Sequence, residues 1–186
     1  MVAGSKRTRW LMIGAIVAAV LAVPATSFAS TATATLSAGS LAFVSAPGNI
    51  TFSATLNGTD QTVTSNQGLD VGDATGSGAG WNITATSTTF TTGTHTLSTS
   101  ATTVTSTPGV ACDASVTCTT ATNSVSYPYT LPAGGTAPTA TKLFNAAANT
   151  GMGNQTVTVA WKLAVPASTF AGTYTSTWTI SLVSGP

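Results

Sequence analysis

Threonine and serine alternate with apolar residues along most of the chain after Phe28. Alternation with a period of two, in segments rich in β-branched residues, is typical of β-strands. No stretch after Phe28 keeps a helical period over three turns, although residues 139–148 show a weak helical pattern that would not alter the fold class. The pattern predicts strands at residues 31–37, 41–46, 50–56, 61–66, 81–91, 94–105, 124–131, 139–145, 155–165 and 173–183.

Clusters of glycine, proline, asparagine and alanine separate these segments. They lie at residues 47–49, 57–58, 76–80, 108–109, 134–135, 151–153 and 171–172, where the chain is expected to turn. Many short strands at this spacing predict an all-β fold, a β-sandwich of Ig-like or Greek-key type with about 9–10 strands. Because no linker and no repeat of fixed period divides residues 30–186, we expect a single domain.

Residues 84–107 consist largely of threonine and serine, a composition also found in disordered, glycosylated stalks. However, the stretch follows Trp81 and Ile83 and itself contains Phe90, Leu97 and Val104. Apolar residues of this size are what a sandwich core needs and what a disordered segment lacks. We therefore favour strands over a stalk.

The first 29 residues have the three regions of a secretory signal peptide. Basic residues come first, an apolar run follows from Trp10 to Val23, and small residues surround Ala29. A membrane helix is the alternative, but the run is shorter than the roughly 20 residues that cross a bilayer. We expect a signal-peptide helix over residues 1–29, cleaved after Ala29, and a secreted mature chain.

Charged residues are rare, and export makes them rarer. The whole chain has a net charge of +1, whereas residues 30–186 retain two lysines against four aspartates, a net charge of −2. Binding to nucleic acid or to an anionic lipid surface requires a basic surface, so we expect neither partner. No segment after the signal peptide is apolar for long enough to span a membrane.

Cys112 and Cys118 are separated by five residues in a chain that is expected to be exported. The oxidising environment outside the cell favours a small disulfide loop between them. A metal site would need further histidine or cysteine ligands, and His95 is the only histidine. We expect no metal and no other cofactor.

None of the ionisable residues forms a recognisable catalytic arrangement. His95 has no nucleophile motif such as Gly-x-Ser-x-Gly beside it, and is expected to face solvent or lie at a hairpin edge. Asp70 and Asp73 are weak candidates for a calcium site, and Asp73 is better suited to capping a turn. A glycosidase would need two carboxyl groups with different pKa values, and the only carboxyl side chains in residues 30–186 are those of four aspartates. We therefore expect that the protein is not an enzyme.

Two tryptophan motifs carry a resemblance to a known family. Residues 73–80, which include Gly76, Gly78 and Gly80, lead into Trp81-Asn82-Ile83-Thr84. The glycines do not form a phosphate loop, because no helix follows them, and we interpret them as a tight turn or bulge that aims Trp81.

The second motif lies near the C-terminus and contains Tyr174, Trp178 and Ile180. Residues 151–153 (Gly-Met-Gly) and 163–166 (Leu-Ala-Val-Pro) precede it. Together the motifs resemble the WxL domain of Gram-positive surface proteins, in what we expect to be an actinobacterial-like variant. Isoleucine replaces the family's leucine at Ile83 and Ile180, whereas Trp161-Lys162-Leu163 spells the motif literally in another segment.

The resemblance covers roughly residues 33–186 and implies a protein held non-covalently on the cell wall through peptidoglycan, often together with other surface proteins. Trp81, Ile83, Tyr174, Trp178 and Ile180 are then the candidate binding residues. Side chains two positions apart in a strand share a face, so these residues are also suited to the core. The functional alternative is an exposed aromatic platform that stacks on sugar rings.

A structural role is the main alternative function. Low charge and high β-content favour association between sheet edges, since charged residues are what usually prevents it. The segment 31–37 is the candidate strand for pairing with a neighbour in a filament or layer. A hydrolase of wall polymers is the least favoured function.

Overall fold

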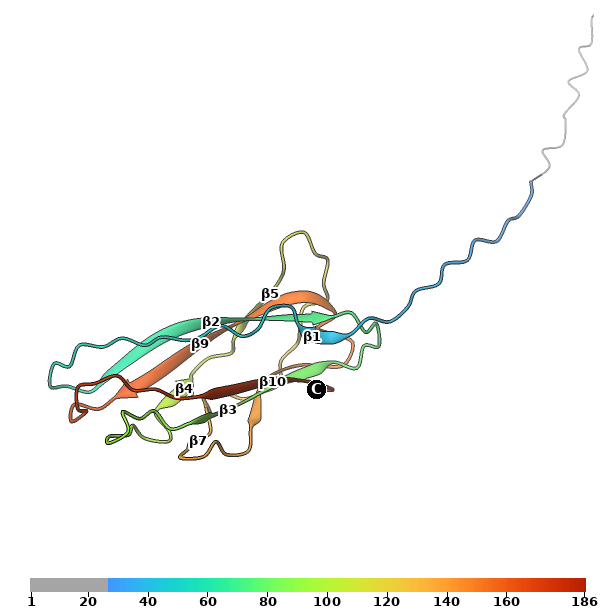
Figure 1. The fold of residues 1–186 in the computed structure, drawn as a ribbon. Coiled ribbons are helices and arrows are strands. Elements are labelled where there is room, and N and C mark those ends of the chain that lie inside the picture. Colours follow the sequence, from blue (N-terminus) through green and yellow to red (C-terminus); the bar gives the residue numbers. More distant parts are fainter. Residues whose placement is uncertain (1–26) are drawn as a thin grey trace, which may run out of the picture. The chain divides into compact units, whose positions relative to one another are not determined.

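The computed structural model describes residues 27–186, and every regular element in this range is a β-strand (Figure 1). Residues 36–186 form one compact unit. Residues 27–35 are exposed and have no regular structure. The signal peptide predicted for residues 1–29 lies outside the described residues except for its last three. Within residues 27–186, no helix is both long and apolar enough to cross a membrane.

The larger of two sheets has six strands. Its order is β1-β2-β9-β4-β6, and β5 also pairs with β9. The strands are β1 (Leu41–Phe43), β2 (Gln61–Asp73), β4 (Thr102–Val104), β5 (Gly109–Cys112), β6 (Tyr129–Thr130) and β9 (Gly153–Val165). All its pairings are antiparallel.

The smaller sheet has four strands in which β3 is central. β10 pairs with one edge of β3, and β7 and β8 also pair with β3. The strands are β3 (Trp81–Thr88), β7 (Ala133–Gly134), β8 (Thr141–Ala146) and β10 (Trp178–Ser184). The two sheets form a sandwich, so the predicted all-β sandwich is confirmed.

The pairing of β2 with β9 is the longest in the fold. It runs without interruption from Gln61↔Val165 to Asp73↔Gly153. Because alternate residues of a strand point to opposite faces, one face of each strand can be entirely apolar. The inward faces supply Leu69, Val71, Val157, Val159 and Trp161, all fully buried.

Opposite these residues, the smaller sheet contributes a second set of large buried side chains. Trp81 and Ile83 of β3 are fully buried. In β8, Leu143 is also fully buried, and only 1 % of the surface of Phe144 is exposed. Together they form the main core, against which the half-buried Trp178 and Ile180 of β10 pack.

Several predicted strands are wrong or shorter than expected. Residues 31–37 and 50–56 form no strand, because they have no partner strand to complete a ladder. Residues 94–105 contribute only β4, 124–131 only β6, 41–46 only β1, and 173–183 form a strand only from Trp178. The segment 139–148 is not helical but contains β8, whereas the alternation pattern does not predict β5 and β7.

Candidate functional site

The first tryptophan motif is part of the core. Trp81 has no exposed surface, its indole nitrogen donates a 2.9 Å hydrogen bond to the carbonyl of Gly151, and its ring lies 5.9 Å from that of Phe144. Ile83, two residues further along β3, is also fully buried. A ligand in solution cannot reach either side chain in this conformation.

Glycines before and opposite Trp81 make this position possible. Gly76, Gly78 and Gly80 have φ angles of 63°, 64° and 74°, which only glycine adopts without strain. Gly80 lies directly against the carbonyl of Ala146, and a Cβ on Gly151 would come within 2.6 Å of the Trp81 indole nitrogen. The interpretation of the 76–80 segment as a turn into Trp81 is therefore confirmed.

The second motif has a different environment. Tyr174, Trp178 and Ile180 are half-buried; Trp178 and Ile180 occupy alternate positions of β10, whereas Tyr174 precedes the strand, next to the isolated bridge between Thr175 and Thr91. Alternate residues of a strand share a face, so Trp178 and Ile180 point the same way, and Tyr174 lines the same hollow. They border an open cleft at the edge of the sandwich.

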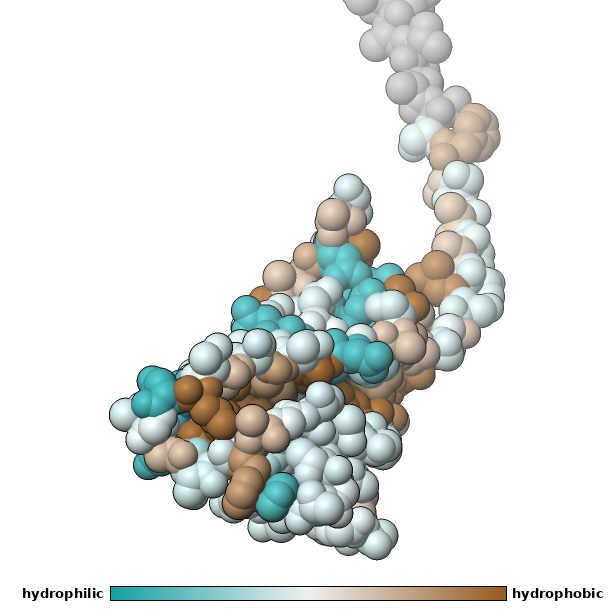
Figure 2. All heavy atoms as spheres, turned by 60° about the vertical axis from the view of Figure 1, so that its left-hand side comes forward, coloured by the Kyte–Doolittle hydropathy of each residue, from teal (hydrophilic) through white to brown (hydrophobic). Residues whose placement is uncertain are grey.

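This cleft consists of two adjoining hollows of about 780 Å³ and 680 Å³. The first lies between residues 47–52 and 174–180, and the second between residues 50–56 and 169–174. The two share Ile50, Thr51, Phe52, Phe90 and Tyr174. None of the described residues that line the two hollows is charged. Figure 2 shows apolar surface in brown running between two paler banks.

The cleft is open because residues 45–60 run beside β2 without joining the sheet. Val44 donates the last backbone hydrogen bond of this strand edge, to the carbonyl of Asp70. Beyond it, side chains provide the tethers: the Gln67 amide donates to the Gly48 carbonyl at 2.8 Å, and the Gln61 amide donates to the Thr55 carbonyl at 2.9 Å. Figure 1 shows this segment alongside β2 with no strand drawn in it.

A series of edge-to-face aromatic contacts connects the cleft with the core. Ring centroids are 6.1 Å apart for Phe52 and Phe90, 6.4 Å for Phe90 and Trp178, and 4.8 Å for Trp178 and Trp161. The buried Trp161 donates a 3.0 Å hydrogen bond to the side-chain oxygen of Gln67. Each such aromatic pair stabilises the fold by about 0.5–1.5 kcal/mol beyond its burial.

A second aromatic group lies at the far end of the cleft. The imidazole of His95 stacks on Phe170 with centroids 3.9 Å apart and planes 10° from parallel, and 61 % of Phe170 is exposed. The Tyr174 hydroxyl donates to the Phe170 carbonyl at 3.1 Å. His95 belongs to a tight turn closed by the bridge between Thr91 and Thr96, which confirms its predicted place at a hairpin edge.

Residues 20–186 match the family model of the WxL domain, which is described as a surface cell wall-binding domain. The chain belongs to the WxL domain family. The predicted location at the cell wall and cell surface is therefore confirmed, and the cell wall is a partner of this protein. Comparisons with curated proteins and with solved structures find no significant match.

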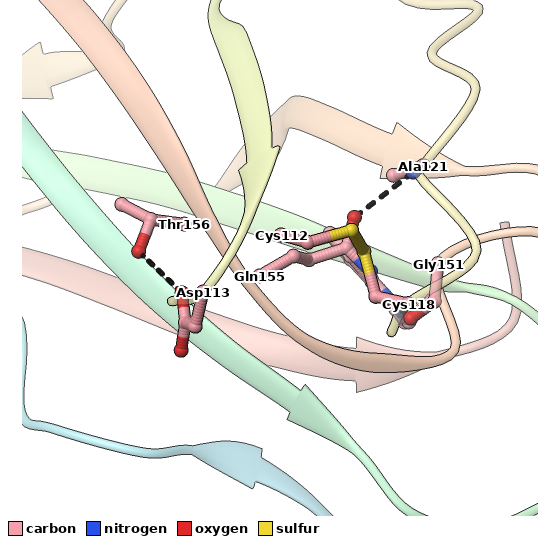
Figure 3. The surroundings of a disulfide bond; sticks show 8 residues. Cys112, Asp113, Cys118, Ala121, Gly151, Gln155 and Thr156 are labelled. Carbon is pink, nitrogen blue, oxygen red and sulfur yellow. Dashed lines mark hydrogen bonds between the residues drawn. A yellow bond between two sulfur atoms is a disulfide. The ribbon is translucent and has the colours of Figure 1, made fainter. Parts of the chain in front are cut away.

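The Cys112–Cys118 disulfide predicted for this WxL domain is present (Figure 3). It closes a loop that extends from β5 and lies against Gly153, where a Cβ would come within 3.1 Å of Cys118. Cys112 is in register with Gln155, and the cleft residue Gln67 is in register with Val159, four residues further along β9. At about 3.4 Å per residue the separation along the sheet is roughly 14 Å, and neither cysteine lines the cleft.

The two aspartates that were weak candidates for a calcium site have other roles. Asp73 accepts hydrogen bonds from the backbone and hydroxyl of Thr75, at 3.0 Å and 2.7 Å, and so caps the turn as expected. Burial raises the pKa of Asp70, and the negative charge of Asp113 raises this pKa further. In the described part of the chain, no group of three or more histidine, cysteine or acidic side chains could hold a metal ion.

Sequence motifs identified only one bank of the cleft. Ile50 and Phe52 on the opposite bank, together with Phe90 and Phe170, do not belong to any motif. The sequence signal for these four residues was weak. They are large apolar residues in segments where most neighbours are threonine, serine or alanine. Trp178 belongs to a motif, but the motif does not show that its ring spans the boundary between core and cleft.

Proposed function

We propose that this WxL domain binds peptidoglycan non-covalently through the cleft, and that it acts by binding rather than by catalysis. The observation that carries the proposal is the lining of the cleft. Aromatic and hydroxyl side chains line it together, without a charged group, at the open edge of the sandwich.

A glycan strand has the chemistry that such a lining recognises. Sugar rings present apolar C–H faces, which stack on aromatic rings, and hydroxyl groups at their edges, which exchange hydrogen bonds with serine and threonine. Phe170 and Tyr174 offer ring surface, and Ser53, Thr169 and Thr173 offer hydroxyl groups beside them. A hollow of 680 Å³ is within the range of about 300–1,000 Å³ for small-ligand sites.

The positions of the aspartates support binding without catalysis. Hydrolysis of a glycosidic bond requires two carboxyl groups on either side of that bond. Asp60 accepts a hydrogen bond from the backbone of Ala167 at 2.8 Å, and Asp73 caps its turn. Asp70 and Asp113 lie together beside β5, distant along the sheet from Phe170 and Tyr174.

Sedimentation with purified cell walls of the host tests the proposal. We expect the exported protein to pellet with walls, and Phe170→Ala and Tyr174→Ala each to weaken binding about tenfold, which corresponds to about 1.4 kcal/mol. Phe170 is largely exposed, so its replacement leaves the fold intact. Val183→Ala is the matched control, because Val183 is an exposed apolar residue outside the cleft.

Peptidoglycan stripped of its attached polymers identifies the wall component. Binding that persists on stripped peptidoglycan, and that changes little between low and high salt, supports the proposal because no charged group lines the cleft. Loss of binding on stripping would assign the interaction to another polymer. Equal binding by the Tyr174→Ala, Phe170→Ala and Val183→Ala variants would exclude the cleft.

A further inference from the structure

The free edge of β10 has hydrogen-bonding groups without partners. Thr177 accepts a backbone hydrogen bond from Thr88, and Gly185 donates one to Gly80, both on the β3 side. In an antiparallel ladder, residues alternate between facing the partner strand and facing away from it. The backbone groups of Trp178, Ile180 and Leu182 therefore point away from β3, toward the free edge.

No described strand pairs with this edge. In the described part of the chain, β10 pairs only with β3, and β1 lies close to part of β10 without pairing with it. Beyond the edge lies the first hollow, and its opposite bank, residues 47–52, is held by the side chain of Gln67 and not by a ladder. The sandwich is thus open at a position where one more strand could bond to β10.

The usual protections of a sheet edge are missing from β10. Natural proteins block such edges with lysine, other charges, proline or bulges, because an unprotected edge pairs with other chains. Residues 178–184 contain neither a charge nor a proline, and their register with β3 is regular from Trp178 to Ser184. The edge is therefore competent to accept a strand.

The described chain also contains a segment with the properties of a donor strand. In residues 31–37, hydroxyl side chains occupy the odd positions, whereas Ala32, Ala34 and Leu36 occupy the even ones. All are exposed, and 94 % of Leu36 is exposed. As a strand, the segment would present an apolar face to the cleft and a hydroxyl face to water.

Backbone hydrogen bonds at Gly39 and Ser40 fix the direction in which the chain enters β1. Gly39 donates to the carbonyl of Ala74 at 2.8 Å, and Ala74 donates to that of Ser40 at 3.1 Å, which fixes the start of β1 beside the end of β2. From there β1 runs toward the cleft, in register from Leu41↔Asp73 to Phe43↔Val71. Insertion into its own cleft would require the chain to reverse at Ala38, the one residue between segment 31–37 and the Gly39 N–H that is bonded to Ala74.

We infer that residues 31–37 of one copy add as a strand to the free edge of β10 in a second copy. Their apolar side chains would cover the hollow between β10 and residues 47–52. Because donor and acceptor are different surfaces, the contact is head-to-tail, and such contacts build open filaments or closed rings. This self-assembly goes beyond wall binding and depends on a different part of the cleft, the first hollow beside Ser176 to Ile180.

Light scattering after size-exclusion chromatography of the exported protein tests the inference. We expect the wild-type chain to grow beyond the monomer mass between about 1 μM and about 1 mM, and Leu36→Asp to remain monomeric because it places a charge on the apolar face. Thr35→Asp is the matched control: it adds the same charge to the hydroxyl face and is expected to assemble like the wild type. Both residues are exposed, so folding is unaffected.

A synthetic peptide of residues 30–38 locates the acceptor. Added to the Leu36→Asp protein, it is expected to shift the backbone NMR signals of β10 and residues 47–52, and a peptide with Leu36→Asp is expected to shift neither. A wild-type protein that is monomeric throughout, or equal assembly of the two variants, would overturn the inference. Wall sedimentation of the monomeric Leu36→Asp protein reports on the proposed function separately.

Discussion

At the scale of single residues, Gly151 determines whether Trp81 can occupy the core. Its φ is 78°, and a Cβ at this position would approach the indole nitrogen to 2.6 Å, so both the backbone and the space exclude larger side chains. Gly151→Ala is expected to lower the free energy of unfolding by at least about 2 kcal/mol, from backbone strain and displacement of the ring. Urea denaturation followed by circular dichroism measures this loss.

Gly135→Ala is the control for that substitution. Gly135 has no atom within 4 Å of a Cβ position and no positive φ, so alanine fits there without strain. The free energy of unfolding of this variant is expected to remain within about 0.5 kcal/mol of the wild type. Equal stability of the Gly151→Ala and Gly135→Ala variants would show that the glycine is not required for the Trp81 position.

Asp70 makes the stability of the domain depend on pH. Burial and the charge of Asp113 raise its pKa in the folded state above the ordinary value of 3.8. Folding therefore favours the protonated carboxyl, and this contribution is complete below pH 3.8 and is lost as the pH rises through the folded-state pKa. Asp70→Asn is expected to raise the melting temperature at pH 7 and to change it little at pH 3.

Asp113→Asn provides an independent check on the cause. It removes the neighbouring charge, so the pKa of Asp70, followed by NMR titration of its carboxyl carbon, is expected to fall. An unchanged pKa would show that burial alone is responsible. A melting temperature for Asp70→Asn that rises equally at both pH values would contradict the electrostatic explanation.

At the scale of elements, alternation alone did not decide which segments become strands. Residues 50–56 alternate apolar and polar side chains as clearly as β9 does, yet they form no ladder. Residues 67–73 of β2 contain Gly68, Gly72 and two aspartates, which are poor strand formers, and they are nonetheless paired along their whole length. Pairing with β9 decides the outcome, and it is a property of the fold that local sequence does not contain.

The disulfide shows the reverse case, in which local sequence was sufficient. Two cysteines close together in an exported chain predict a bridge without knowledge of the fold. A disulfide that closes a loop of this length stabilises the folded state by about 2 kcal/mol, because it reduces the conformational entropy of the unfolded chain. The loop also reaches from β5 to Gly153 at the start of β9, a contact that the spacing of the cysteines did not reveal.

At the scale of the whole molecule, the sequence predicted the class of fold, and its motifs named residues on one bank of the candidate cleft. Period-two alternation and frequent turns are sufficient for an all-β sandwich, and the tryptophan motifs led to the family. They could not distinguish the buried Trp81 from the half-exposed Trp178, because both are followed two residues later by isoleucine in a strand. That distinction depends on position, since β3 is central in its sheet and β10 lies at an edge.

Because the tryptophans differ in exposure, their fluorescence can report whether the cleft is occupied. Trp81 and Trp161 are fully buried, so their emission is insensitive to an occupant of the cleft, whereas the half-buried Trp178 borders the first hollow. An apolar occupant would remove water from its ring and shift the emission of the exported protein to shorter wavelengths. Titration with wall fragments or with the 30–38 peptide, read by fluorescence and compared with Trp178→Phe, is expected to show this shift only in the wild type.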